Sequence, residues 1–219
     1  IMYSIIIPVY NEIKSIRILL EKIKPFRINL KNEIIVVDDG SDDGTEKILE
    51  KCDYIKLIRL QNNHGKGYAI KEGFKHSTKN KIILFDGDME LDPKLICQLM
   101  ILTKKTRCVF GSRYNTFSPP SSFWDLGNIF FTWIFNFVND TDYDDILCCA
   151  KSFYKEDIDL HKVKSNKFDI DVELASILDR KVKDIHIIPL VYSRRSGYEG
   201  KKLGVLDSYT ILSRILSSY

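Results

Sequence analysis

Three acidic side chains follow one short apolar run and could together hold a divalent cation. Asp86-Gly87-Asp88 comes directly after residues 81–85 (KIILF), and Glu90 stands two residues further on. Carboxylate oxygens suit Mg²⁺ or Mn²⁺, which keep bound waters and take further ligands from substrate phosphates. Gly87 would let the backbone approach a ligand closely. Aspartates after a strand can also cap the next helix, so the spacing alone leaves both roles open.

A second acidic stretch and a lysine between two glycines could bind a nucleotide. Within residues 38–44 (DDGSDDG), Asp39 could accept a hydrogen bond from a base N–H group or from a ribose hydroxyl. Gly65-Lys66-Gly67 begins a helical pattern and could offer backbone N–H groups and one cation to a diphosphate. Both stretches are also ordinary turn sequences, so neither is decisive by itself.

Four apolar strands must position these side chains. They are expected at residues 3–9, 33–37, 54–60 and 81–85, with intervening helices at 13–23, 45–52 and 68–76. This alternation predicts an α/β fold with a parallel sheet and helices on both faces. Ligands bind outside the carboxyl ends of such strands, so the polar stretches that follow the strands are expected to meet at one site.

The remaining residues continue the same domain, because no linker or low-complexity break interrupts them. Helices are expected at residues 94–103, 123–138, 168–180 and 207–219, and strands at 108–111 and 183–192. We therefore expect a single domain over residues 1–219.

Composition and charge exclude some classes of function. The 219 residues contain 33 Lys and Arg and 30 Asp and Glu, a net charge of +3, which does not predict a nucleic-acid partner. No apolar run reaches the roughly 18 residues that a membrane-spanning helix needs. Five cysteines without metal-ligand spacing predict a reduced, intracellular chain. No signal peptide precedes the first strand, and we expect the natural chain to begin at Met2 rather than Ile1.

Motifs in both halves of the chain resemble the family 2 glycosyltransferases of GT-A fold. In the first half they are residues 5–12 (IIIPVYNE), 36–45 (VVDDGSDDGT), 63–69 (NHGKGYA) and 86–88 (DGD). The second half resembles the branch of dolichyl-phosphate and undecaprenyl-phosphate sugar transferases, through residues 111–114 (GSRY), 145–151 (DILCCAK), 168–173 (FDIDVE), 189–192 (PLVY) and 194–202 (RRSGYEGKK). The likeness spans nearly the whole chain and implies a Rossmann-like, mainly parallel sheet flanked by helices on both faces.

This resemblance implies a donor site for a nucleotide diphosphate sugar in residues 1–92. The residues that would line the base and ribose are Pro8, Tyr10, Glu12, Val37 and Asp39. Asp86, Asp88 and Glu90 would hold Mg²⁺ or Mn²⁺ against the diphosphate, beside Gly87 and Lys66. Such an ion would offset charge that grows on the leaving diphosphate.

The same resemblance places the acceptor in residues 93–219. A phosphate acceptor is already ionised and needs cations rather than a general base. The candidate cations are Arg113, Lys151, Arg194, Arg195, Lys201 and Lys202. Residues 194–202 would form a loop that becomes ordered when donor and acceptor bind. Relatives commonly place an arginine shortly before the pair that matches Gly127-Asn128, and this chain has Asp125 there.

Two acidic residues near the start of the expected helix 168–180 are further catalytic candidates. Family 2 enzymes that act on hydroxyl acceptors place an acidic base here, which would be Asp171, with Glu173 as second choice. With a phosphate acceptor the two residues would instead orient the donor sugar or the basic loop. Acidic residues at a helix N-terminus also favour the helix dipole without any further role.

Residues 123–138 form an aromatic helix with one polar stripe. Asp125, Asn128, Thr132 and Asn136 align along it, leaving a broad apolar face. This face would suit the surface of a membrane, under which a lipid tail could lie. It would equally suit the protein core or a homodimer interface.

The resemblance predicts an inverting, metal-dependent glycosyltransferase that moves a sugar from a nucleotide diphosphate sugar to a polyprenyl or dolichyl phosphate. We expect the chain to be cytoplasmic and peripheral at the inner face of the membrane. Two alternatives remain open at this point: transfer to a glycan hydroxyl in cell-surface polysaccharide synthesis, and a nucleotide-binding module without catalysis.

Overall fold

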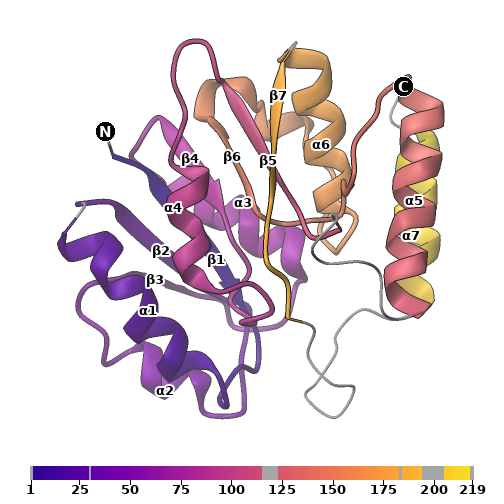
Figure 1. Ribbon diagram of the computed structural model, residues 1–219. Helices are drawn as coiled ribbons and strands as arrows, with labels where there is room; N and C mark the ends of the chain where they lie inside the picture. Colours follow the sequence, from indigo (N-terminus) through magenta and orange to yellow (C-terminus); the bar gives the residue numbers. More distant parts are fainter. Residues whose placement is uncertain (1, 30, 115–122, 183, 194–204, 218–219) are drawn as a thin grey trace.

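One mixed sheet runs through the centre of the molecule. The computed structural model describes residues 2–29, 31–114, 123–182, 184–193 and 205–217 (Figure 1). The strands are β1 (Ser4–Val9), β2 (Glu33–Asp38), β3 (Lys56–Arg59), β4 (Lys81–Leu84), β5 (Cys108–Ser112), β6 (Lys151–Tyr154) and β7 (Ile185–Pro189). Their order across the sheet is β3-β2-β1-β4-β6-β5-β7. All neighbouring strands are parallel except β6, which runs antiparallel to both β4 and β5.

Helices cover both faces of this sheet, as the alternating pattern predicts. They are α1 (Ile16–Ile28), α2 (Thr45–Leu49), α3 (Lys66–His76), α4 (Ile96–Leu99), α5 (Phe123–Asn139), α6 (Ile170–Lys181) and α7 (Val205–Ser217), with 3-10 turns η1 (Pro93–Leu95), η2 (Lys155–Asp157) and η3 (Leu160–Lys162). One hydrophobic core packs α1, α2 and α4 against the sheet, and a second packs α3, α6 and α7 against the other face.

The central strand β1 explains why two cores exist. Ile5 and Ile7 point into the first core and Ile6 into the second, and all three side chains are fully buried. An uninterrupted apolar run is the expected sequence of a parallel strand covered on both faces. The carboxyl end of β1 is therefore fixed between β2 and β4, whose ends carry the acidic stretches.

Three elements of the structure differ from the prediction. Strand β6 was not predicted, because it has only four residues and two of them are polar. The expected helix 94–103 is reduced to η1 and α4, since the backbone leaves the helical conformation at Met100. Helix α1 starts three residues later than expected and continues through Pro25 to Ile28.

Helices α5 and α7 lie side by side at one end of the molecule (Figure 1). Helix α7 also contacts α6, so it connects α5 to the helix that carries Asp171. Among the described residues, every helix is too short or too polar to cross a bilayer.

Candidate active site

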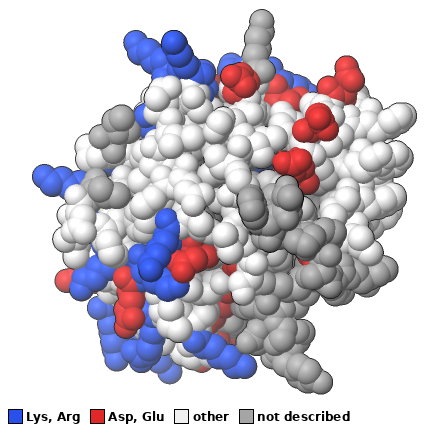
Figure 2. Space-filling view, viewed as in Figure 1, with Lys and Arg blue, Asp and Glu red and all other residues white. Residues whose placement is uncertain are grey.

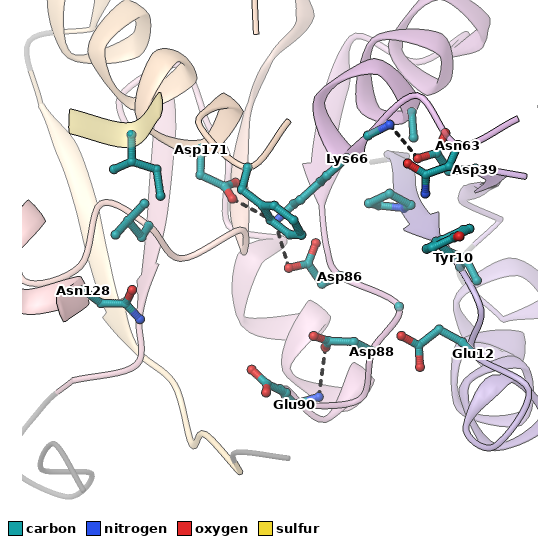
Figure 3. A pocket seen from close by; sticks show the side chains of 18 of the residues that line it. Tyr10, Glu12, Asp39, Asn63, Lys66, Asp86, Asp88, Glu90, Asn128 and Asp171 are labelled. Atoms are coloured by element: carbon teal, nitrogen blue, oxygen red, sulfur yellow. Dashed lines mark hydrogen bonds and ion pairs between the residues drawn. The ribbon is translucent and has the colours of Figure 1, made fainter. Parts of the chain in front are cut away.

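A cavity of about 590 Å³ lies at the carboxyl ends of β1, β2 and β4. It is lined by Pro8, Val9, Tyr10, Glu12, Asp39, Asn63, Gly65, Lys66, Ala69, Asp86, Gly87, Asp88, Glu90, Arg113, Asn128, Leu147, Phe168, Asp171, Tyr192 and Ile211. The polar stretches that follow separate strands thus meet at one site, as the parallel sheet predicts (Figure 3).

Lys66 forms the electrostatic centre of this cavity. Its Nζ atom donates to Asp86 Oδ2 at 2.9 Å and to Asp171 Oδ2 at 2.8 Å, which are the dashed contacts in Figure 3. Burial alone would lower the pKa of Lys66, but Asp171 and Asp86 raise it well above its ordinary value. Burial alone would raise the pKa of Asp86, but Lys66 and a hydrogen bond from Cys149 hold it below its ordinary value. The cavity therefore contains a charged lysine and an ionised Asp86.

Asp171 keeps one oxygen available inside this arrangement. Its side chain is almost completely buried, and its Oδ1 atom has no hydrogen-bond partner among the described residues. Leaving a buried carboxylate oxygen without a donor costs free energy, which a bound hydroxyl or N–H group would recover. Asp171 is thus suited to accept a hydrogen bond from a ligand in the cavity.

Asp39 fixes the loop that leads into α3. Its Oδ1 accepts from the backbone N–H of His64 at 2.9 Å, and its Oδ2 accepts from that of Gly65 at 2.8 Å. Burial raises the pKa of Asp39 in spite of these two hydrogen bonds. Each carboxylate oxygen has a second lone pair, so Asp39 can hold the loop and still accept from a base or ribose.

The loop after β4 presents the second aspartate of the DGD sequence. A Cβ atom at Gly87 would lie 2.8 Å from a methyl group of Val9 and 3.1 Å from the carbonyl oxygen of Pro8, so only glycine fits this close approach. Asp88 Oδ1 accepts from the backbone N–H of Glu90 at 3.0 Å. Glu90 in turn accepts from the Tyr192 hydroxyl at 2.9 Å, which joins this loop to the segment after β7.

Arg113 lines the other side of the cavity. Its Nε and Nη2 atoms donate to the fully buried Asp145 carboxylate at 2.7 and 2.9 Å. Burial alone would lower the pKa of Arg113, but Asp145 raises it well above its ordinary value. The Nη1 atom has no hydrogen-bond partner among the described residues, so the charged guanidinium can still donate to a ligand.

Several predicted site residues lie elsewhere. Val37 is fully buried in the second core against Gly73 and does not line the cavity. Glu173 also lies outside the cavity and accepts from the backbone N–H groups of residues 164 and 165. Lys151 is fully buried, and its Nζ donates to the carbonyl oxygens of Ile146 and Cys148, because strand β6 turns it into the protein.

Four predicted cations cannot be placed. Arg194, Arg195, Lys201 and Lys202 lie outside the described residues. Conversely, the cavity is also lined by four residues that were not predicted as site residues: Asn63, Asn128, Phe168 and Tyr192. Asn63, Phe168 and Tyr192 lie within the quoted motifs, and Asn128 belongs to the Gly127-Asn128 pair, so their place in these motifs was the available signal.

The polar stripe of α5 faces inward, and its aromatic face is exposed. Asp125 accepts from the Tyr114 hydroxyl at 3.0 Å, and Asn128 donates to the same hydroxyl at 2.7 Å. On the opposite face lies an aromatic ridge of Leu126, Phe130, Trp133 and Phe137, with Phe137 80% exposed. The interpretation of α5 as a core helix is therefore wrong for this apolar face.

The donor set fits a divalent ion that takes part of its coordination from a substrate. Asp86 and Asp88 both line the cavity, and two carboxylates are what Mg²⁺ commonly takes from a protein when phosphates complete its shell. Among the described residues, no three His, Cys, Asp or Glu side chains gather into a complete metal site. Asp86, Asp88 and Glu90 thus do not form a preassembled triad.

A family model decides the classification of the chain. Residues 4–161 match the model described as "Glycosyl transferase family 2". The chain belongs to this family. In this member of family 2, the DGD loop, Asp39 and Lys66 thus line one cavity.

The curated relatives of this family 2 chain are considerably longer. An undecaprenyl-phosphate 4-deoxy-4-formamido-L-arabinose transferase from Proteus mirabilis is 35% identical over 117 residues, which are 50% of this chain and 36% of that protein. An uncharacterized glycosyltransferase from Synechocystis is 38% identical over 105 residues, covering 44% and 32% of the two chains. The matched part thus spans about a third of these relatives.

Solved structures confirm the GT-A fold expected for a family 2 member. Glucosyl-3-phosphoglycerate synthase from Mycobacterium tuberculosis, in complex with Mn²⁺, UDP and glucosyl-3-phosphoglycerate, superposes with a TM-score of 0.76 at 16% identity, covering 99% of this chain and 79% of that one. Mannosyl-3-phosphoglycerate synthase from Rubrobacter xylanophilus gives a TM-score of 0.73 at 13% identity, covering 99% and 72%.

Proposed function

We propose that this chain transfers a sugar from a nucleotide diphosphate sugar to the phosphate of a polyprenyl lipid. The observation that carries the proposal is the single cavity that gathers Asp39, Lys66, Asp86 and Asp88 at the carboxyl edge of the sheet. The relatives named as undecaprenyl-phosphate transferases support the lipid phosphate as the acceptor.

The donor would lie along the first-half side of the cavity. Asp39, Tyr10 and Glu12 line the part that would take the base and ribose, and Lys66 would turn one N–H bond toward the diphosphate. Asp86 and Asp88 would hold Mg²⁺ or Mn²⁺, which when bound would offset the negative charge of the leaving diphosphate. The neighbour solved with Mn²⁺ and UDP supports this choice of ligand class.

The acceptor would approach from the side of Arg113. One phosphate oxygen would attack the anomeric carbon of the donor sugar while the bond from that carbon to the diphosphate oxygen breaks. A single displacement of this kind inverts the anomeric centre and releases the nucleoside diphosphate. A phosphate oxygen carries no proton that must be removed, so Arg113 would orient the nucleophile without a general base.

Turnover of radiolabelled UDP and GDP sugars tests the proposal, with undecaprenyl phosphate as acceptor and Mn²⁺ or Mg²⁺ present. We expect a lipid-linked product of inverted configuration. If no nucleotide sugar yields a lipid product while metal-dependent nucleotide binding persists, the chain is a nucleotide-binding module instead.

Transfer to a glycan hydroxyl is the second candidate, and the buried Asp171 oxygen without a partner favours it. Asp171 could take the proton that a hydroxyl loses as it attacks. The variant Asp171→Asn separates the two. It should abolish transfer to a hydroxyl, whereas transfer to a phosphate should survive in part.

The aromatic ridge of α5 supports peripheral binding to the cytoplasmic face of a membrane. Trp133 stacks against Phe130 and Phe137 at centroid distances of 6.5 and 6.1 Å, and all three side chains are more than half exposed. On this side of the molecule Figure 2 shows a mostly uncharged surface with several Asp and Glu side chains toward the top, while Lys and Arg gather mainly on the opposite side. Insertion of apolar side chains, rather than attraction to anionic lipids, would therefore drive this binding.

A further inference from the structure

A buried ion-pair network lies at the start of α6, outside the cavity. Arg214 of α7 donates from Nε to Asp169 at 3.1 Å and from Nη1 to Glu173 at 3.3 Å. Both carboxylates are more than nine-tenths buried. A buried carboxylate that loses its cation is strongly destabilised, so Arg214 fixes the positions of both acids.

The two carboxylates hold a short segment of backbone in turn. Glu173 accepts from the backbone N–H of Lys164 at 3.0 Å and of Ser165 at 2.7 Å. Asp169 accepts from the Ser165 hydroxyl. Three hydrogen bonds to ionised groups thus determine where residues 164–166 run.

This segment lies directly against the glycine turn that presents Lys66. The carbonyl oxygen of Asn166 accepts from the backbone N–H of Tyr68 at 3.1 Å, which satisfies one of the unpaired N–H groups at the start of α3. A Cβ atom at Gly65 would lie 2.4 Å from the Asn166 oxygen, and one at Gly67 would lie 2.8 Å from the Ser165 oxygen. The two backbones touch so closely that a displacement of one must displace the other.

We propose that Arg214 is a positioning residue for the diphosphate site. Arg214 holds Glu173 and Asp169, and these two acids hold the backbone of residues 164–166. That backbone in turn supports the glycine turn that presents Lys66 to the cavity. The inference deepens the proposed function and rests on it for the identity of the ligand. It assigns to Glu173 a positioning role in place of the catalytic role expected from the sequence.

The coupling itself can be measured without any ligand. In Arg214→Ala, amide exchange followed by NMR should accelerate at Tyr68 by about threefold to thirtyfold, the range that couplings between neighbouring networks produce. Arg107→Ala is the matched control, because Arg107 also pairs with a buried acid, Asp157, but lies away from the cavity. Unchanged exchange at Tyr68 in Arg214→Ala would overturn the proposal.

Nucleotide binding then tests whether the coupling between Arg214 and the Lys66 turn affects the affinity for the ligand. Titration of UDP and GDP with Mn²⁺ should show affinity weakened by about the same factor in Arg214→Ala, while Arg214→Lys recovers part of it and Arg107→Ala retains it. If Arg214→Ala does not fold, Glu173→Gln provides the second test, because it keeps the shape and removes the charge. If the wild-type chain binds neither nucleotide, the proposed function fails, whereas the exchange result still decides the coupling.

Discussion

On the side of the cavity proposed for the donor, Glu12, Asp39 and Asp86 follow three neighbouring parallel strands, each a few residues beyond its end. On the side proposed for the acceptor, Arg113 follows β5, and Asn128 and Asp171 lie in α5 and α6, which are far apart along the chain. The donor side is thus assembled by local sequence on a regular sheet. The acceptor side depends on pairing between distant segments, such as Arg113 with Asp145.

The largest effect on the donor side is expected from removing Asp88, the proposed metal ligand. Asp88→Ala should lower turnover at least about hundredfold, the loss typical when one preorganised electrostatic group is removed. A chelator should have a comparable effect on the wild type. Asp92→Ala is the control, since Asp92 pairs with Lys22 at the surface and lies outside the cavity. Turnover of Asp88→Ala within twofold of the wild type would exclude this residue from the metal site.

Lys66 is the residue at which the two sides meet, because it pairs with Asp86 from the first half and Asp171 from the second. Lys66→Met should lower the free energy of unfolding by about 3 kcal/mol, since the buried Asp171 and the partly buried Asp86 then lose their cation. Lys22→Met breaks an exposed pair and should cost at most about 1 kcal/mol. Denaturant unfolding measures both losses of stability. Equal losses would show that the ion pairs of Lys66 stabilise the fold no more than an ion pair at the surface.

Arg113→Lys should weaken binding of the acceptor without affecting binding of the nucleotide. It keeps the charge but loses both the bidentate pairing with Asp145 and the Nη1 donor left for the phosphate, so we expect the KM for the acceptor to rise about tenfold. The affinity for the nucleotide should stay within twofold of the wild type. Arg107→Lys makes the same change away from the cavity. A nucleotide affinity that falls as much as the acceptor affinity would place Arg113 on the donor side.

The smallest effect on chemistry is expected at the aromatic ridge. The double variant Trp133→Ser and Phe137→Ser should reduce sedimentation with phosphatidylglycerol vesicles several-fold, because each lost side chain removes apolar area from the bilayer. Its nucleotide affinity should not change. Ile18→Ser removes a similarly exposed apolar side chain from α1. Vesicle binding that this control lowers equally would argue against a role specific to α5.

The donor side was predictable from the sequence for a physical reason. Parallel strands align their carboxyl ends, so apolar runs followed by acidic stretches indicate one shared site without any knowledge of side-chain contacts. Gly87 lies at this same edge of the sheet, and in the structure its close approach is to Pro8 and Val9 of β1. Val37 is the exception, because it lies within β2 and its side chain is buried in the second core, whereas Asp39 lies beyond the end of the strand.

The acceptor side was less predictable because its contacts are long-range. Lys151 was expected to bind the acceptor phosphate and Glu173 to be the second choice of catalytic base, but β6 buries the first, and the backbone of residues 164 and 165 engages the second. No local pattern shows that Lys66 would pair with Asp171, 105 residues away. Charge alone does not distinguish a ligand-binding side chain from one that the fold itself requires.

The position of α7 has a consequence for how the chain could be divided. The family match ends at residue 161, yet Ile211 and Ile215 of α7 are fully enclosed together with Val172 and Leu178 of α6. A fragment cut at that boundary would expose the apolar surface of α3 and β5 to water and invite aggregation. The stretch recognisable by homology is therefore shorter than the stretch that must fold together.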